Sequence, residues 1–265
     1  ISVLSIAGQA QNMVTPGTGV NWNLDSLAMN FPGSVSKISA TEFQMSDSLE
    51  VAANDTLMLT ESLLVWRIDS GMLVRVNGTF ISDAGGSVIG ITGPDTTKPF
   101  YGFRFEEFST VSFYGTTIKF GGGLRVLTED FRMEGCEVSY HSSGASTGGA
   151  INFSRGNPVV KNSIFRGNEL PAFASGANQE VGAVIMFNLL EGNRQANGNR
   201  PQINLGPSGL NDTTYIIGNT VKGDRNLDLV GGVSVSSLLS VHLNAVIDSN
   251  LVRHNRYGIT MAGTN

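Results

Sequence analysis

The sequence predicts an all-β chain wound into a right-handed parallel β-helix, a solenoid of stacked coils, with a short N-terminal cap. A short polar phrase recurs along the chain, and apolar residues alternate with polar ones on both sides of it. The 265 residues include 33 glycines and only 15% are charged, as in chains that turn often. These observations favour many short strands joined by tight corners.

The recurrent phrase combines a small polar residue, two mostly apolar residues, a charge, and then Asn or Asp. Residues 249–255 read "SNLVRHN" and residues 218–224 read "GNTVKGD". Its second residue recurs every 20 to 31 positions, which is typical of a solenoid whose loops vary in length while its strands do not. This second residue is Thr116, Cys136, Ser163, Asn188, Asn219 or Asn250.

Apolar residues stand two positions after and three positions before the second residue in every copy. Because side chains alternate between the faces of a strand, both columns should point into the core. A further strand with alternate apolar positions is expected in each coil. The first two columns contain Ile118, Val138, Phe165, Leu190, Val221 and Val252, and Phe113, Met133, Val160, Ile185, Ile216 and Ile247. The inward pairs expected on the further strand are Leu124/Val126, Ile151/Phe153, Ala172/Ala174, Ile203/Leu205, Leu227/Leu229 and Ile259/Met261.

Polar residues at two corners of the coil are predicted to be structural. Asn188, Asn219 and Asn250 should stack with their side chains inward, so that their amides bond along the stack and to turn backbone. Cys136, the single cysteine, should be a small buried side chain in the same column. The next corner should use left-handed backbone, which Asn and Asp tolerate. Its expected members are Asn168, Asn193, Asp224 and Asn255.

The N-terminal residues predict export. Residues 1–10 read as the remnant of an export signal, with Gly8 and Ala10 at the small-x-small positions of a cleavage site. This interpretation predicts a secreted or cell-surface protein of bacterial export, and the alternative is a buried first strand.

The remaining chain divides into two predicted segments. Residues 11–42 should form the N-terminal cap and the first strand, with a short helix starting near Asn23 or Asp25. Residues 43–265 should form the β-helix, which ends without a matching cap and is therefore expected to be truncated at its C-terminus.

The Asn-bearing repeats resemble those of the right-handed parallel β-helix family, the pectate-lyase-like solenoids. The stretch "VRVNGTFIS" at 74–82 also looks like the first coils of secreted bacterial β-helix repeat proteins. The resemblance covers about residues 43–263. It implies the fold, and it implies that groups acting on sugars would lie on an exposed strand face.

Composition argues against two classes of partner. The formal net charge of −5 disfavours a nucleic-acid-binding protein. A chain without 18 consecutive apolar residues is not expected to span a membrane. The oligomeric state is not predicted.

No catalytic residue and no cofactor are predicted. The outward column of the further strands offers one carboxylate, whereas a glycosidase needs a pair. A lyase would need Arg125 and Asp228 together, but four coils at ~4.8 Å each separate them by about 19 Å. The expected column is Arg125, Asn152, Phe173, Asn204, Asp228 and Thr260.

A calcium loop at residues 224–228, "DRNLD", is an open alternative to a plain corner. Leu229 stands where such a loop requires glycine.

A second outward column mixes basic and acidic residues. It could suit an acidic polysaccharide, or it could consist of alternate charges that pair along a solvated face. Its members are Lys119, Ser139, Arg166, Glu191, Lys222 and Arg253.

A groove is predicted where the loops 141–149 and 193–201 enter strands two coils apart. Phe173 would lie outward there, between Asn152 and Asn204, and could stack on a sugar while the amides bond to its hydroxyls. Two more residues, Arg194 and Arg200, would add charge at the rim. The alternative is that the loops cover and bury Phe173.

The sequence therefore favours a secreted or cell-surface β-helix that binds extended carbohydrate, a polysaccharide or other glycan. A polysaccharide lyase or glycoside hydrolase with missing or unrecognised active coils is one alternative. A structural adhesin or stalk is the other.

Overall fold

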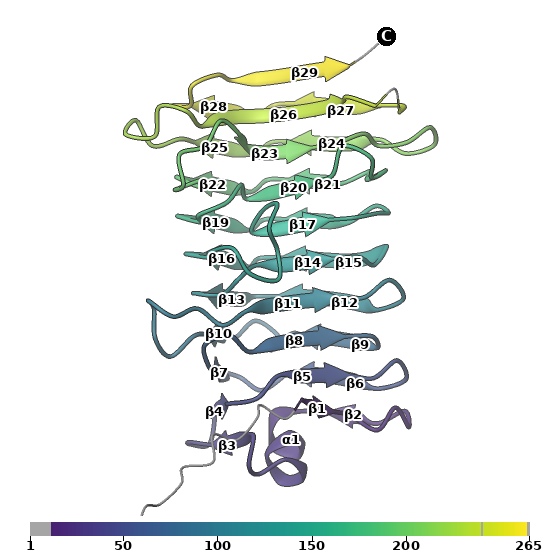
Figure 1. Cartoon of the computed structure of the whole chain (residues 1–265), viewed down its shortest axis with the longest axis vertical. Helices are drawn as coiled ribbons and strands as arrows, with labels where there is room; N and C mark the ends of the chain where they lie inside the picture. Colours follow the sequence, from purple (N-terminus) through teal and green to yellow (C-terminus); the bar gives the residue numbers. More distant parts are fainter. Residues whose placement is uncertain (1–11, 240, 264–265) are drawn as a thin grey trace, which may run out of the picture.

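The computed structural model describes residues 12–239 and 241–263, which form a parallel β-solenoid (Figure 1). Each coil contributes one strand to each of three sheets, here numbered 1 to 3 in chain order. The predicted all-β class and solenoid are confirmed, and the hand of the winding stays a prediction. The segment 1–10, predicted as an export remnant, lies outside the described residues.

The strands of each sheet come from successive coils, and almost all neighbours are parallel. Sheet 1 contains β1 (Met13–Val14), β5 (Leu49–Val51), β8 (Leu73–Val76), β11 (Gly102–Phe105), β14 (Leu124–Val126), β17 (Ile151–Phe153), β20 (Phe173–Ser175), β23 (Pro201–Leu205), β26 (Gly231–Ser237) and β29 (Ile259–Gly263). Sheet 2 contains β2 (Asn21–Trp22), β6 (Thr56–Leu59), β9 (Thr79–Ser82), β12 (Thr110–Tyr114), β15 (Asp130–Glu134), β18 (Val159–Lys161), β21 (Val184–Met186), β24 (Thr214–Ile217) and β27 (Ala245–Asp248). Sheet 3 contains β3 (Val35–Lys37), β4 (Glu42–Met45), β7 (Val65–Ile68), β10 (Ile89–Thr92), β13 (Thr116–Lys119), β16 (Glu137–Ser139), β19 (Ile164–Arg166), β22 (Leu189–Glu191), β25 (Thr220–Lys222) and β28 (Leu251–Arg253).

The first two predicted columns point into the core, as expected. Ile118 pairs in register with Val138, which pairs with Phe165, and the column continues from coil to coil. Every member is buried except Ile247 and Val252 in the last coil, which are partly buried. The alternation of apolar residues therefore predicted sheets 2 and 3 correctly.

Sheet 1 departs from the prediction in two strands. In β20 the expected pair Ala172/Ala174 is wrong, because Phe173 points inward beside Ile151 and Ala174 takes the outward position. In the coil of β26 the expected pair Leu227/Leu229 lies in a loop, and Val233 and Val235 of β26 are the inward residues. The loop before β26 is longer than the sequence pattern suggested.

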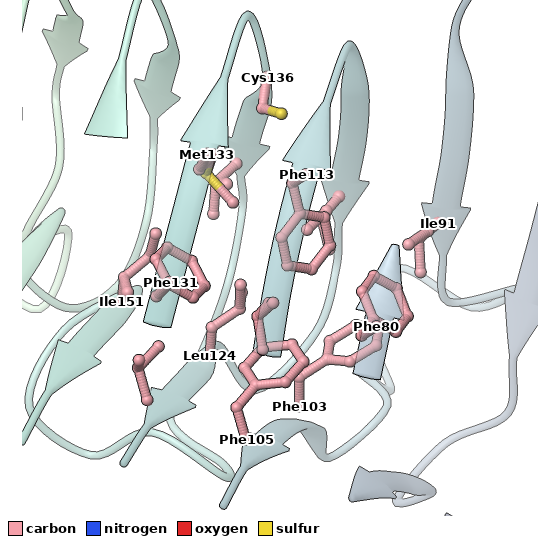
Figure 2. Close-up of a cluster of buried hydrophobic side chains, with 14 of the residues drawn as sticks. Phe80, Ile91, Phe103, Phe105, Phe113, Leu124, Phe131, Met133, Cys136 and Ile151 are labelled. Carbon is pink, nitrogen blue, oxygen red and sulfur yellow. The ribbon is translucent and has the colours of Figure 1, made fainter. Parts of the chain in front are cut away.

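Aromatic rings stack through the middle coils and fill the space between the sheets (Figure 2). Phe103 and Phe105 are stacked with ring centroids 5.8 Å apart, and Phe113 lies edge-on to both. Phe131 continues the row toward Phe153, with centroids 5.9 Å apart. Burial of such rings attracts neighbouring coils to one another.

A continuous row of side chains occupies the corner between sheets 2 and 3. Asn219 Oδ1 accepts a hydrogen bond from the backbone N–H of Asn188 (2.9 Å), and Asn219 Nδ2 donates to the Ile185 carbonyl (2.9 Å). Asn219 Nδ2 also donates to Asn250 Oδ1 (3.0 Å). These bonds satisfy backbone groups that a buried corner would otherwise leave unpaired. The predicted stack of Asn188, Asn219 and Asn250 is confirmed.

The same row extends into earlier coils through smaller side chains. Asn188 Oδ1 accepts from the Ser163 N–H (2.9 Å), and Ser163 Oγ accepts from the Cys136 N–H (3.1 Å). Cys136 is buried, as predicted, and this burial raises the pKa of its thiol to about 11. The thiol therefore stays protonated and acts as a weak donor, with Sγ 3.3 Å from the Glu134 carbonyl oxygen.

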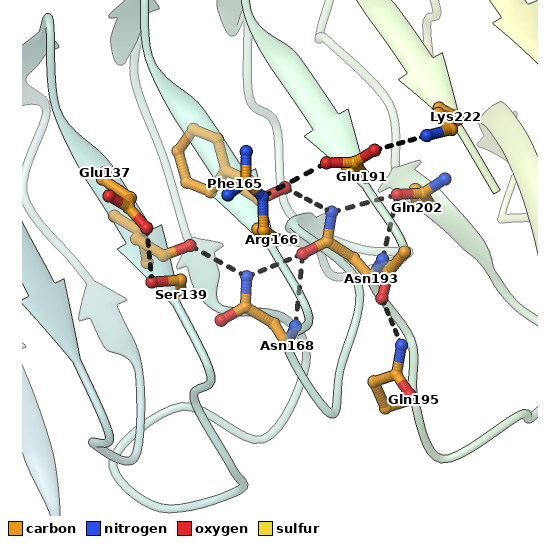
Figure 3. Close-up of polar contacts among 12 residues, drawn as sticks. Glu137, Ser139, Phe165, Arg166, Asn168, Glu191, Asn193, Gln195, Gln202 and Lys222 are labelled. Atoms are coloured by element: carbon orange, nitrogen blue, oxygen red, sulfur yellow. Dashed lines mark hydrogen bonds and ion pairs between the residues drawn. The ribbon is translucent and has the colours of Figure 1, made fainter. Parts of the chain in front are cut away.

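A second row occupies the corner between sheets 3 and 1 (Figure 3). Asn168 Nδ2 donates to Asn193 Oδ1 (2.7 Å), and Asn193 Nδ2 donates to Gln202 Oε1 (3.0 Å). Gln202 Nε2 then donates to Asn255 Oδ1 (3.0 Å). Gln202 thus takes the place in the row that Asn168 and Asn193 have in their own coils. Asp224 lies at the corner after β25, as predicted, but its side chain does not join the row. An ionised carboxylate has no proton to donate along the row, whereas an amide both donates and accepts.

The left-handed backbone at this corner lies one residue earlier than predicted. Gly167 (φ 61°) and Gly192 (φ 60°) adopt it immediately before Asn168 and Asn193. Glycine has no Cβ to oppose this conformation. The Asn side chains are therefore required for their amides, and the glycines for the turn.

His141 takes the place of an amide in an earlier coil of the second row. Its Nδ1 accepts from the Gly123 N–H (3.1 Å), so Nε2 carries the proton and donates to the Ile118 carbonyl (3.1 Å). The ring is fully buried, and the loss of solvent lowers the pKa of the imidazole to about 4. His141 is therefore a neutral structural residue.

A short cap covers the N-terminal coil. Helix α1 (Leu24–Asn30) begins after the N-cap Asn23, as predicted, with Asn23 Oδ1 accepting from the Ser26 N–H (2.8 Å) and Ser26 Oγ accepting from the Asn23 N–H (2.8 Å). Strand β3 adds to β4 in the antiparallel sense. The segment 11–42 also supplies β1 and β2, which already belong to the parallel sheets.

Charges pair along the outer face of sheet 3. Glu191 forms ion pairs with Arg166 (3.2 Å) and with Lys222 (2.6 Å), one in each neighbouring coil (Figure 3). Lys119 pairs with Glu137 (3.1 Å). The alternate-charge interpretation of this column is the one that the geometry supports.

Replacing Asn219 by Leu should destabilise the fold by about 2–3 kcal/mol, because the Asn188 N–H and the Ile185 carbonyl lose their partner inside the core. Chemical denaturation measures this loss. Asn211→Leu on an exposed loop is the matched control and should change little. An unchanged denaturation midpoint for Asn219→Leu would contradict a role of this row of corner side chains in stability.

The neutral His141 should make stability depend on pH. The unfolded chain takes up the proton near pH 6.5 and the folded chain only near pH 4, so stability should fall as the pH falls through this window. The shift corresponds to about 3 kcal/mol. His141→Gln should be less stable than the wild type at pH 7 and should lose less of its stability between pH 7 and pH 4. Urea unfolding of both proteins at several pH values measures this, and parallel curves would contradict the assignment.

Candidate functional site

The outer face of sheet 1 carries a cavity of about 590 Å³ over β14, β17, β20, β23 and β26. Its floor is one column of outward residues that pair in register from coil to coil. Successive members are about 4.8 Å apart, so the floor is about 19 Å long. The members are Arg125, Asn152, Ala174, Asn204 and Ser234.

The small side chain of Ala174 deepens the middle of this floor. It lies between Asn152 and Asn204, the two amides that the sequence predicted to face a ligand. Both amides line the cavity, as predicted. An amide presents donors and an acceptor together, which suits it to sugar hydroxyls.

Both loops that were predicted to form the rim contribute to the walls. Gly148 of the loop 141–149 lies against Asn152, and a Cβ there would come within 3.0 Å of the Asn152 amide. Asn199 and Arg200 of the loop 193–201 line the cavity from the other loop. Asn178 and Gln179, in the turn after β20, also line the cavity.

Phe173 does not line the groove, and its predicted outward position is wrong. The ring is fully buried, 4.4 Å by centroid from Phe165 and stacked on Phe153 at 6.2 Å. Ala172, Phe173 and Ala174 are all buried, so burial alone does not reveal which residue faces inward. The larger side chain occupies the core because it buries the greater apolar area there.

Arg194 is the second misplaced residue. Its guanidinium lies over Gly198, where a Cβ would be 2.0 Å from Nη2, and Nη1 donates to the Glu169 carbonyl (3.4 Å). Burial and the nearby Arg200 charge lower the pKa of the Arg194 guanidinium. Arg194 therefore packs within the loop 193–201. Of the two arginines predicted at this rim, only Arg200 lines the groove.

Tyr257 is a lining residue that the sequence did not predict. It follows β28 and lines the groove together with Arg200. Its ring lies flat against the backbone of Gly231, where a Cβ would be 2.0 Å from the ring carbon Cζ. The pair Gly231–Gly232 was an available signal, because consecutive glycines at a strand start leave room for a ring from the next coil.

The groove has a positive electrostatic character although the chain is acidic overall. Arg125 and Arg200 line it, and no Asp or Glu of the described chain does. Arg125 Nε is buried and has no hydrogen-bond partner among the described residues.

A second cavity of about 710 Å³ adjoins the groove and has the opposite character. The two cavities share Asn178 and Gln179. Five carboxylates line the second one, against two arginines: Glu106, Glu107, Glu129, Glu180 and Asp212, with Arg104 and Arg155. The charge lining therefore changes sign across one turn of the chain.

The residues proposed for chemistry do not assemble in the groove. Asp228 is in the loop before β26 and accepts from Asn197 Nδ2 (3.1 Å), so it does not belong to the strand column. In the residues predicted as a possible calcium loop, Asp224 Oδ1 accepts from the Asn226 N–H (2.9 Å), as a turn residue does. Within residues 12–239 and 241–263, no three His, Cys, Asp or Glu side chains are grouped to hold a metal.

Among the described residues, no helix combines the length and the apolar character needed to cross a membrane. Comparison with protein-family models finds no match, and comparisons with curated proteins and with solved structures find no significant match.

Phe173→Ala should cost about 3–5 kcal/mol of stability, because it removes a fully buried ring from between Phe153 and Phe165. A melting curve measures the loss. Ala174→Ser, one residue away and on the outer face, is the matched control and should change the melting temperature little. A thermal transition of Phe173→Ala that coincides with the wild type would contradict the inward placement.

Proposed function

We propose that this protein binds an extended glycan in the groove on sheet 1, and that it does so as a secreted or cell-surface protein. The observation that carries the proposal is the row of outward hydrogen-bonding side chains Arg125, Asn152, Asn204 and Ser234 along one open floor. A polymer lying along the solenoid axis could meet a similar group on successive coils. A compact ligand would use only part of that floor.

Tyr257 supports a carbohydrate ligand in the place where Phe173 was expected to do so. Its ring lines the groove, and an aromatic face favours the apolar face of a sugar ring. The amides of Asn152 and Asn204 can bond to the hydroxyls of the same polymer. The groove thus combines an aromatic ring with amides, as predicted, but the ring belongs to Tyr257 and not to Phe173.

The charges of the groove favour a glycan that carries anionic groups. Arg125 and Arg200 are the charged lining residues in the described chain. Arginine binds carboxylate or ester oxygens with two parallel donors. Binding should therefore weaken as salt rises, because these arginines are partly exposed to solvent.

Binding is favoured over catalysis because the groove lining offers arginines, amides and hydroxyls, and no carboxylate pair comes from the described residues. The likeness to pectate-lyase-like solenoids is part of this proposal and supports a ligand on an outer strand face. A structural stalk is the function that remains when no glycan binds.

Asn204→Ala should weaken glycan binding by about fivefold for one lost hydrogen bond, and Asn152→Ala with Asn204→Ala should weaken it more. A glycan array followed by calorimetry on the strongest ligand measures this at two salt concentrations. Asn211→Ala is the matched control, since Asn211 is exposed on a loop outside the groove. Melting curves for all variants should coincide. Retention of no glycan by the folded wild type, or equal binding by all variants, would contradict the proposal.

A further inference from the structure

Basic side chains of two successive coils gather at the corner after sheet 3. Lys222 ends β25 and Arg253 ends β28, and the two residues pair in register. Arg225 lies in the loop after β25, and His254 directly follows β28. We call Arg225, Arg253 and His254, with Lys222 at their edge, the basic corner.

The contact between Arg225 and His254 is unusual for two basic groups. Arg225 Nη2 lies 3.0 Å from His254 Nε2. A guanidinium only donates, so the imidazole must accept and must be neutral. His254 stands directly before Asn255, as Gly167 stands before Asn168, and it has the same left-handed backbone (φ 57°). The corner thus holds a second basic side chain close to a permanent positive charge.

The positive charge of the basic corner is only partly compensated. Lys222 pairs with Glu191 (2.6 Å), whereas Arg225 and Arg253 have no ion-pair partner within the described residues. Asp224, the carboxylate beside Arg225 in the chain, accepts the backbone N–H of Asn226 (2.9 Å). Asn255, on the other side of His254, is uncharged and donates to the Val221 carbonyl (3.0 Å).

The charges that act on His254 are all positive. Desolvation, and then the charges of Arg225, Arg253 and Lys222, lower the pKa of its imidazole from the ordinary value of 6.5. An anion placed among these groups would offset the lowering of the His254 pKa by the neighbouring positive charges. It would let His254 take up a proton and donate from Nε2, while Arg225 turned its donors to the same anion.

We propose that the basic corner is a binding site for a tetrahedral oxyanion, a phosphate or a sulfate, held by Arg225, Arg253 and protonated His254. Such an anion offers several acceptor oxygens to donors that come from two coils. Arginine donors match this geometry, and the exposed position of the corner admits either a free ion or an ester group on a polymer. This site is separate from the groove and does not depend on glycan binding there.

The site is tested by NMR titration of the His254 imidazole in inorganic phosphate or sulfate, against chloride at equal ionic strength. Either oxyanion should raise the pKa of His254 by at least one unit, which means tenfold tighter binding to the protonated form. Arg225→Gln and Arg253→Gln should each remove most of this rise. Arg132→Gln is the matched control, because Arg132 is exposed on β15 of sheet 2.

A second arm distinguishes the source of the anion. The pKa of His254 is measured by the same NMR titration in dextran sulfate and in dextran of the same length. The wild type, Arg225→Gln and Arg132→Gln are compared. A rise of the His254 pKa with the inorganic ions supports a site for the free ion. A rise with dextran sulfate alone supports a site for the ester. No change with either probe, or an equal loss in Arg132→Gln, would overturn the proposal. Neither result depends on whether the groove binds a glycan.

Discussion

The hydrogen bond from a corner side chain to the backbone of the adjacent coil is the interaction on which the rest of this structure depends. A parallel solenoid turns sharply three times per coil, and each turn removes backbone groups from the ladder of the sheets. At two corners these groups face the core, where water cannot replace the missing partner. Asn188, Asn219 and Asn250 at one corner, and Asn168, Asn193 and Gln202 at the other, supply the partners.

The two rows of hydrogen-bonded corner side chains also explain why the aromatic core is so regular. Once the corners hold successive coils in register, equivalent positions in neighbouring coils stack on one another. Phe113 and Phe131 then each contact a ring from the coil before and a ring from the coil after. Each ring loses its solvent on both sides, so apolar burial accumulates along the axis even though each strand is short.

The groove is a consequence of the same register. A column of outward residues is continuous only because the strands of sheet 1 pair without slipping, from Arg125 to Ser234. The long loops before β17 and β23 can form walls because the rows of corner side chains absorb the corners beneath them, through His141 and Asn193. The rigid part of each coil thus sets the floor, and the variable part sets the shape and the charge of the opening.

Most of the fold could be predicted from the sequence because its periodicity reports which faces are buried. The columns of sheets 2 and 3 and the Asn188, Asn219 and Asn250 stack follow directly from the recurrent phrase. The candidate site was predicted less well. Asn152, Asn204 and Arg200 line the groove, but the inward Phe173, the loop position of Arg194 and the contribution of Tyr257 were missed.

The difference has a physical reason. By itself the sequence determined the solenoid, its corner residues and the side of the molecule on which the two long loops meet, because these depend on local alternation and on repeated spacing. The tertiary structure decided which side chains of β20 point into the core, because Ala172, Phe173 and Ala174 are all apolar and leave the alternation ambiguous. It also decided that Gln202, and not Asp224, joins the second row of corner side chains and that Tyr257 reaches over Gly231. Such contacts join residues of different coils, and their existence depends on loop paths that no periodic pattern encodes.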